Sequence, residues 1–307
     1  MSDLDRTIVR SSAWLALSYG GTQVISLAVT ATLAHLLTPS EFGLVTLAGT
    51  ALLVLGILQE SGLAVATIQR RSDVEEAVAS TFVVSTALGV ALYGGAWVAA
   101  PLAADLLRTP QLTEILRVLA LLLVLRGPST ATAAVIEREL RFGRRAVGEL
   151  SAIAVQSAVA IVVAVLGGGV WSLVAGQLAG QLVQTTMYWV VAPIRPDVRR
   201  ASWRMTRELG RFGRHVTAAN LVGLVDANAD TVTVGRVLGP AAVGSYNLAW
   251  RLSNLPATGL AYVVGRAMLP AYASIATDLD AFRAAFLTNI RRVGLLSLPV
   301  SLGILLA

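Results

Sequence analysis

The sequence of 307 residues contains no cysteine, no lysine and only two histidines. The absence of cysteine excludes a disulfide framework and every metal site with thiolate ligands. Two histidines are too few for a histidine-rich metal centre, so we expect no metal and no cofactor. All 24 basic residues are arginine, and the simplest cause is a GC-rich genome rather than selection for guanidinium chemistry.

Charged residues are also scarce. They make up 14% of the chain, whereas a soluble domain carries about 25%. Mean hydropathy is +0.71. Length alone favours two soluble domains, but this composition predicts an all-α polytopic membrane protein. The isoelectric point near 10.4 is typical of nucleic-acid-binding proteins, an interpretation that the positions of the arginines test.

Long apolar segments predict transmembrane helices of about 20 residues each. Residues 11–37 and 77–104 contain no Asp, Glu or Arg. The uncharged run 150–194 is long enough for two spans, which the turn at Gly167-Gly168-Gly169 would separate. Further spans are predicted at residues 42–68, 112–136, 212–237 and 244–265, and from 293 onward.

We therefore expect eight complete spans and the start of a ninth. The first uncharged run is too long for the apolar core of a signal peptide, which measures about 7–15 residues. The last apolar run reaches Ala307 only 15 residues after Arg292. That length is too short to cross a bilayer comfortably, so we expect the sequence to be a fragment or a frame cut short.

The arginines outside the spans lie almost entirely in alternate loops. Nineteen fall in the N-terminal segment and in the loops after the second, fourth, sixth and eighth spans. Only Arg108 and Arg236 fall in the other loops. The positive-inside rule then predicts a cytoplasmic N-terminus in the plasma membrane. The basic charge thus reflects membrane topology, and we expect no nucleic-acid partner.

Two turns in the sequence resemble each other. Residues 36–43 read LLTPSEFG and residues 237–244 read VLGPAAVG. Leu37, Pro39 and Gly43 align with Leu238, Pro240 and Gly244. Proline ends one helix and glycine lets the chain reverse, so each turn should join the two arms of a helical hairpin on the outer side.

The spacing of the two turns predicts a parallel repeat of about six spans, as in transporters whose halves enclose a central path. The predicted organisation is an N-terminal lobe at residues 1–194, a basic cytoplasmic linker at 195–214 and the start of a C-terminal lobe at 215–307. Within the sixth span, Gly176 and Gly180 form a GxxxG motif that predicts helix packing. Trp97, Trp171 and Trp189 are expected at the membrane interfaces.

Several segments resemble the bacterial polysaccharide transporter, or oligosaccharide flippase, family. They read LLTPSEFGLVTLA, IERELRFGRRA, VLGPAAVGSYNLAWRL, and RAMLPAYASIATDLDAFRAAF followed by LPVSLGILLA. The resemblance covers nearly the whole chain. That family shares a superfamily with the multidrug and toxin extrusion (MATE) pumps and the lipid II flippase.

The resemblance implies a MATE-like bundle of two lobes around a cavity, with twelve to fourteen spans in all. It also implies transport of undecaprenyl-pyrophosphate-linked sugar units from the cytoplasmic to the outer leaflet of the bacterial inner membrane. The expected partners are this lipid-linked oligosaccharide and membrane lipids, with a polysaccharide polymerase and a chain-length regulator as candidates. Because the chain ends in the ninth predicted span, its second lobe would be incomplete.

Ionisable residues inside the spans are the candidate site residues, because charge in hydrocarbon is costly and usually paired or functional. Arg126 lies about 15 Å deep in the fourth span, beside Gly127-Pro128, which should loosen the helix. A guanidinium can bind phosphate oxygens bidentately, so Arg126 is the first candidate for contact with the pyrophosphate. The alternative is a structural ion pair with Glu60, which lies at similar depth in the second span.

A second group of candidates lies in the seventh and eighth spans. Asp230 and Arg251 are equally far from the centre of the second turn, so a hairpin would place them level, and we predict an ion pair between them. The alternative is that substrate or a proton competes for this pair during transport. Asn247 and Asn254 fall on the Arg251 face and would extend a polar stripe. Asp226 is a candidate for binding a coupling proton or sodium ion, or for a structural network.

Other functions fit the sequence less well. A MATE-type multidrug antiporter is the runner-up, but a pump for organic cations would favour carboxylates and aromatic residues. Aromatic residues make up only 6% of this chain. A membrane enzyme would need a large extramembrane loop or an acidic catalytic cluster. The DLD at Asp278–Asp280 lies in an amphipathic stretch, 271–290, without other active-site signals. A scaffold without transport activity is the third alternative.

Overall fold

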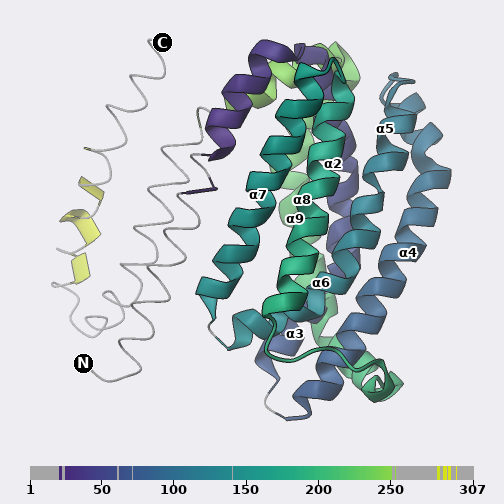
Figure 1. Ribbon diagram of the computed structural model, residues 1–307, viewed down its shortest axis with the longest axis vertical. Helices are drawn as coiled ribbons and strands as arrows, with labels where there is room; N and C mark the ends of the chain where they lie inside the picture. The colour runs from purple at the N-terminus through teal and green to yellow at the C-terminus, as the bar shows by residue number, and fades with distance from the viewer. Residues whose placement is uncertain are drawn as a thin grey trace. The chain divides into compact units, whose positions relative to one another are not determined.

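The computed structural model describes residues 21–22, 25–60, 62–70, 72–139 and 141–250, together with positions 253, 282–283, 286–288, 290–291 and 295. The described residues are almost entirely helical and contain no strand (Figure 1). The chain divides into two compact units, Met1–Gly244 and Ser245–Ala307. The lobe boundaries expected at residues 194 and 214 stay a prediction.

The first unit is a bundle of long helices that run back and forth (Figure 1). A helix at Ile25–Leu36 precedes the labelled elements. These are α2 (Pro39–Glu60), α3 (Leu63–Gln69), α4 (Val74–Leu106), α5 (Leu112–Leu119), α6 (Leu121–Arg138), α7 (Phe142–Val165), α8 (Val170–Val191), the 3-10 turn η1 (Val198–Arg200) and α9 (Trp203–Leu238). A further helical segment occupies residues 240–250.

Four described helices are long and apolar enough to cross a membrane: Pro39–Gln69, Val74–Leu106, Leu112–Arg138 and Gly143–Val165. The helices from Ile25 to Leu238 occupy the positions predicted for the first seven spans. The prediction of an all-α membrane fold is therefore confirmed. Most of the eighth predicted span, of the ninth and of the amphipathic stretch 271–290 lies outside the described residues.

Local sequence chemistry explains where α2 begins. Pro39 occupies its first position, where the missing N–H is not needed. The N–H of Thr38 donates to Glu41 Oε2 at 2.7 Å, and the Thr38 hydroxyl donates to the same oxygen at 2.9 Å. This capping box stabilises the first turn of α2, so the sequence TPSE sets the start of this helix.

The hairpin of α7 and α8 confirms two predictions. Gly167 and Gly169 have φ angles of 81° and 53°, in the left-handed region that glycine adopts without strain, and they form the predicted turn. A Cβ atom on Gly176 would lie 2.8 Å from the carbonyl oxygen of Gln156, and one on Gly180 would lie 3.1 Å from that of Ala152. The GxxxG motif is thus a close helix contact.

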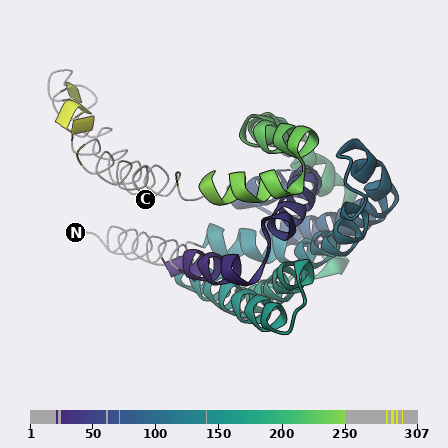
Figure 2. The same ribbon diagram turned by 90° about the horizontal axis from the view of Figure 1, so that it is seen from above.

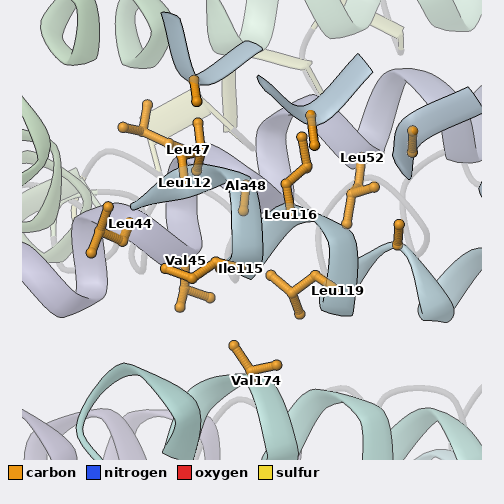
Figure 3. Packing of buried hydrophobic residues seen from close by; sticks show 14 of the residues in the cluster. Leu44, Val45, Leu47, Ala48, Leu52, Leu112, Ile115, Leu116, Leu119 and Val174 are labelled. Atoms are coloured by element: carbon orange, nitrogen blue, oxygen red, sulfur yellow. The ribbon is translucent and has the colours of Figure 1, made fainter. Parts of the chain in front are cut away.

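The largest hydrophobic core lies where α2, α4, α5 and α8 meet (Figure 3). Helix α5 contributes an apolar stripe at i, i+3, i+4 and i+7. These residues are Leu112, Ile115, Leu116 and Leu119, and all are buried. They pack against α2 residues such as Leu47 and against Val174 of α8. The core holds these helices together along one half of their length.

The two ends of this bundle carry different residues. At the Pro39 end, where α2 begins, a Cβ on Gly169 would lie 2.5 Å from Glu41 Oε1, so the α7–α8 turn lies beside the start of α2. At the opposite end, named here the Arg70 end, α3 finishes and α4 and α9 begin. Seen from above, α9 passes beside α2 (Figure 2). It contacts α3 and α4 as well, so it joins the first unit.

Candidate functional site

Helix α6 contains Gly127-Pro128 in its interior, directly after Arg126. Pro128 has no N–H to donate to the carbonyl of Val124, and its ring crowds that carbonyl. Side chains from three neighbouring helices donate hydrogen bonds to backbone carbonyls of α6 near Arg126. We refer to residues 123–128 as the α6 carbonyl segment.

Helices α2 and α4 supply two of these side chains. Gln59 Nε2 donates to the carbonyl oxygen of Leu123 at 2.7 Å and to that of Ser85 at 3.1 Å. Ser85 Oγ donates to the carbonyl oxygen of Gly127 at 2.9 Å. Gln59 is completely buried, and these bonds satisfy both hydrogens of its amide nitrogen. One glutamine therefore ties α2 to α4 and α6.

Helix α8 supplies the other two. Thr185 Oγ1 donates to the carbonyl oxygen of Leu125 at 2.8 Å, and Trp189 Nε1 donates to that of Pro128 at 3.1 Å. The Trp189 ring also meets Phe82 edge-on, with centroids 5.5 Å apart. Trp189 is predicted at the membrane interface, and the structure directs its indole N–H at α6.

Two glycines let these helices approach closely. A Cβ on Gly127 would lie 2.8 Å from Thr86 Cα, and a Cβ on Gly89 would lie 2.6 Å from Gln59 Nε2. Gln59 Oε1 and Thr86 Oγ1 are buried without a hydrogen-bond partner. The α6 carbonyl segment is therefore a tightly packed polar region inside an apolar bundle. Its shape leaves no space for a larger residue at either glycine.

Arg126 extends from this segment toward α2. Its Nη1 lies 3.3 Å from where a Cβ on Gly56 would be, so the glycine provides room for the guanidinium. The side chain is exposed, as is Glu60. Within the described part of the chain, no ion pair joins Arg126 to Glu60 and no hydrogen bond holds the guanidinium. The alternative in which Glu60 neutralises Arg126 therefore has no ion pair to support it there.

The candidates in the seventh and eighth spans are described only in part. Asp226 and Asp230 are exposed on α9, and Asp230 Oδ1 accepts from the N–H of Thr231 at 2.7 Å. Asn247 is half-buried in the helical segment 240–250. Arg251 and Asn254 lie outside the described residues, so their ion pair and polar stripe stay predictions. The described residues contain no cluster of acidic or histidine ligands for a metal ion.

Charged side chains make several of the contacts at the Arg70 end of the bundle. Arg70 Nη1 lies 2.8 Å from Glu208 Oε2 of α9. Arg138 Nη1 donates to the carbonyl oxygens of Ile68, at 3.0 Å, and Arg70. The linker before α9 is bound to the start of α4, where Arg200 pairs with Glu75. Most of the predicted cytoplasmic arginines that the structure describes in this part thus have protein partners.

A sequence profile of the family described as "Polysaccharide biosynthesis protein" matches residues 32–307. The chain is 25% identical over 299 residues to the succinoglycan biosynthesis transport protein ExoT of Rhizobium meliloti, covering 97% of this chain and 60% of ExoT. It is 25% identical over 275 residues to the lipopolysaccharide biosynthesis protein WzxC of Escherichia coli, covering 89% of this chain and 56% of WzxC.

It is also 23% identical over 312 residues to the teichuronic acid biosynthesis protein TuaB of Bacillus subtilis, with coverage of 99% and 63%. The chain therefore spans about three fifths of the length of these curated relatives.

Solved structures show the same fold. The chain is similar to a multidrug resistance MATE family transporter of the MOP superfamily in an inward-facing conformation, with a TM-score of 0.62 and 19% identity over 94% of this chain and 68% of that one. A MATE structure in the straight conformation matches with a TM-score of 0.56 and 18% identity, over 99% of this chain and 71% of that one. The MATE-like fold that the resemblance implies is thereby confirmed. Sequence identities this low support a shared fold and nothing about function.

Proposed function

The chain belongs to the polysaccharide biosynthesis protein family, and we propose that it is a flippase for lipid-linked oligosaccharides. Its substrate would be an undecaprenyl-pyrophosphate-linked repeat unit, moved from the cytoplasmic to the outer leaflet of the bacterial inner membrane. In this proposal the Arg70 end faces the cytoplasm and the Pro39 end faces outward. A polysaccharide polymerase and a chain-length regulator are the proposed partners downstream.

The unpaired guanidinium of Arg126 is the observation that carries this proposal. A lipid pyrophosphate is anionic, and its transfer through hydrocarbon without a counter-charge would be prohibitively costly. Arg126 offers a planar set of donors that matches phosphate oxygens. Because it is exposed and no described residue neutralises it, it is available to an anionic ligand.

The α6 carbonyl segment explains how Arg126 would keep its position. Bonds from Gln59, Ser85 and Trp189 fix the backbone on both sides of it. A binding residue works best when its own backbone is rigid, because less ordering is then needed when the ligand arrives. In this proposal the packed polar region is the support, and Arg126 is the group that contacts the pyrophosphate.

Arg126→Gln tests the site, with Arg117→Gln as the matched control. Arg117 lies in α5, where its Nε donates to the carbonyl of Trp97 at 3.2 Å and its guanidinium covers the Trp97 ring. That carbonyl is one that Pro101 leaves without a helical donor, so Arg117 is structural. We expect Arg126→Gln to reduce flipping about tenfold or more, since a charged hydrogen bond contributes roughly 1.5–3 kcal/mol. Arg117→Gln should flip substrate at a rate close to that of the unmodified protein.

The experiment is run in a strain in which the chromosomal gene is depleted. Depletion should cause lipid-linked repeat units to accumulate on the inner leaflet, and the plasmid-borne variants are compared for rescue at equal membrane abundance. Rescue by Arg126→Gln equal to that by Arg117→Gln would remove the proposed role of Arg126. If depletion leaves these lipids unchanged but sensitises cells to cationic drugs, the chain is instead a MATE-type antiporter.

A further inference from the structure

The two related turns of the sequence touch each other in the structure. A Cβ on Gly43 would overlap the carbonyl oxygen of Pro240 and lie 3.1 Å from the nitrogen of Gly244. A Cβ on Gly244 would overlap the carbonyl oxygen of Pro39 and lie 3.1 Å from the nitrogen of Gly43. All four residues belong to the first compact unit.

This Gly43–Gly244 contact is reciprocal, because each glycine faces the proline that precedes the other by four positions. The sequence repeat aligns the same residues: Pro39 with Pro240 and Gly43 with Gly244. The contact is therefore formed by equivalent atoms of the two repeats, as across a two-fold axis. The spacing resembles the small-xxx-small pattern that lets membrane helices meet at their backbones.

The contact is continuous with buried packing one turn further along. A Cβ on Gly235 of α9 would lie 2.6 Å from Leu47 Cδ2 and 3.3 Å from Val243 Cγ2. Leu47 and Val243 are almost completely buried. Thr231, one turn from Gly235 on the same face of α9, is 7% exposed. The Pro39 end is thus sealed by backbone contact and then by apolar side chains.

We propose that the Gly43–Gly244 contact is the gate that closes the outer side of the transport path. The two repeats meet here without side chains, so the gate closes to backbone distance and opens by separating the starts of α2 and the 240–250 helical segment. This inference depends on the orientation in the proposed function, but not on the identity of the cargo.

The chain has no cysteine, so a single introduced thiol reports how accessible the sealed region is. Thr231→Cys is the reporter, labelled in intact cells with a membrane-impermeant maleimide. In the otherwise unmodified chain we expect slow labelling. Adding Gly43→Ala or Gly244→Ala should speed labelling about tenfold or more, because a methyl group forced against a backbone oxygen destabilises the closed state.

Gly49→Ala is the matched control. It makes the same change in the same helix, at a glycine whose Cβ would meet nothing within 4 Å, and labelling of Thr231→Cys should stay slow. Both substitutions disrupt the same contact, so their effects on labelling should not multiply. The double variant should label no faster than about the sum of the two single-variant increases in labelling rate. Unchanged labelling in both single variants, or faster labelling only in inside-out vesicles, would overturn an outer gate.

A second experiment needs no glycine variant and so stands even if those variants fail to fold. Ser40→Cys and Ala241→Cys place one thiol on each side of the contact, next to Pro39 and Pro240. We expect a short bifunctional thiol reagent to link them and to abolish transport, with recovery on reduction. Full transport by the linked chain would overturn the gate. Changed labelling without any movement of lipid-linked oligosaccharide would instead overturn the proposed cargo and leave the gate intact.

Discussion

The two ends of the helical bundle differ in the contacts that close them. At the Pro39 end, Gly43 and Gly244 meet each other's repeat at backbone distance. At the Arg70 end, α9 is joined to α3 and α4 by a buried apolar cluster that includes Met205 and Leu209, and ion pairs such as Arg70–Glu208 are added to it. The Gly43–Gly244 contact is therefore made by backbone atoms, whereas the Arg70 end combines apolar packing with long charged side chains.

This difference decides what can change the strength of each closure. A backbone contact has no charge to screen and no side chain to swing away, so only added volume should weaken it. Exposed ion pairs contribute little individually and weaken as salt rises. We infer that the Pro39 end behaves as a steric stop, and that the Arg70 end adds small, salt-sensitive contacts to an apolar cluster and one rigid point.

That rigid point is Gly62, and its replacement should give the largest effect. Gly62 has a φ of 63°, and a Cβ there would lie 2.5 Å from Gly213 Cα of α9. Gly62→Ala therefore adds both left-handed strain and an overlap, which together should lower the free energy of unfolding by about 3 kcal/mol. Thermal unfolding of the purified protein in detergent measures this loss.

Gly167→Ala separates the two causes. Gly167 has a φ of 81° but open space around its Cβ position, so only the strain of about 1–2 kcal/mol should remain. A loss for Gly62→Ala no greater than that for Gly167→Ala would show that Gly62 and Gly213 are not in tight contact. The Arg70 end would then depend on its apolar cluster and its ion pairs, and the contrast with the Gly43–Gly244 contact would be sharper.

Much of the fold follows from local sequence signals. The turns at Pro39, Gly167 and Pro240 could be predicted because proline and glycine bias the backbone wherever they occur. The contact between the first and last of these turns could not, since they are 201 positions apart. Their meeting depends on how all the intervening helices pack, which no local pattern encodes.

The candidate site shows a similar limit. Arg126 is visible in the sequence because a charge interrupts an apolar run. Gln59 and Thr185 are not, because an uncharged polar residue in such a run attracts no notice until its carbonyl partner is known. Pro128 does not reveal them either, because it frees the carbonyl of Val124, whereas Gln59 and Thr185 bond to the carbonyls of Leu123 and Leu125.

Gln59→Met, at the middle of the bundle, should lower the free energy of unfolding by less than Gly62→Ala and by more than loss of an ion pair at the Arg70 end. Methionine fills a similar volume but cannot donate to the carbonyls of Leu123 and Ser85, which Gln59 reaches at 2.7 and 3.1 Å. Interhelical hydrogen bonds in membranes contribute about 1–2 kcal/mol at most, and the buried Oε1 without a partner is removed at the same time. We therefore expect a loss of about 1 kcal/mol in the free energy of unfolding.

Transport by Gln59→Met should fall by more than this loss explains, if Gln59 positions Arg126 by fixing α6. Flipping is measured at equal amounts of folded protein, with the affinity for the lipid-linked substrate determined separately. A purely structural role would leave affinity per folded molecule unchanged. Gln59→Glu is the companion variant, because a protonated carboxyl can restore one donor and with it part of the affinity.

The smallest effects are expected from the ion pairs at the Arg70 end. Arg70–Glu208 is the better protected pair, with side chains 24% and 44% exposed, whereas Arg200 and Glu75 are 57% and 56% exposed. A double-mutant cycle with Arg70→Gln and Glu208→Gln should give a coupling of about 0.5–1 kcal/mol. The same double-mutant cycle at Arg200 and Glu75 should give a coupling free energy close to zero.

Salt provides the decisive comparison between the ends. Between about 0.05 and 1 M salt the coupling at Arg70–Glu208 should largely disappear, because the Debye length shrinks to about 3 Å. The labelling rate of Thr231→Cys, which reports the Pro39 end, should not change over the same range. Salt-dependent labelling would mean that charged contacts also hold the glycine gate closed, and the two ends would then differ in degree rather than in kind.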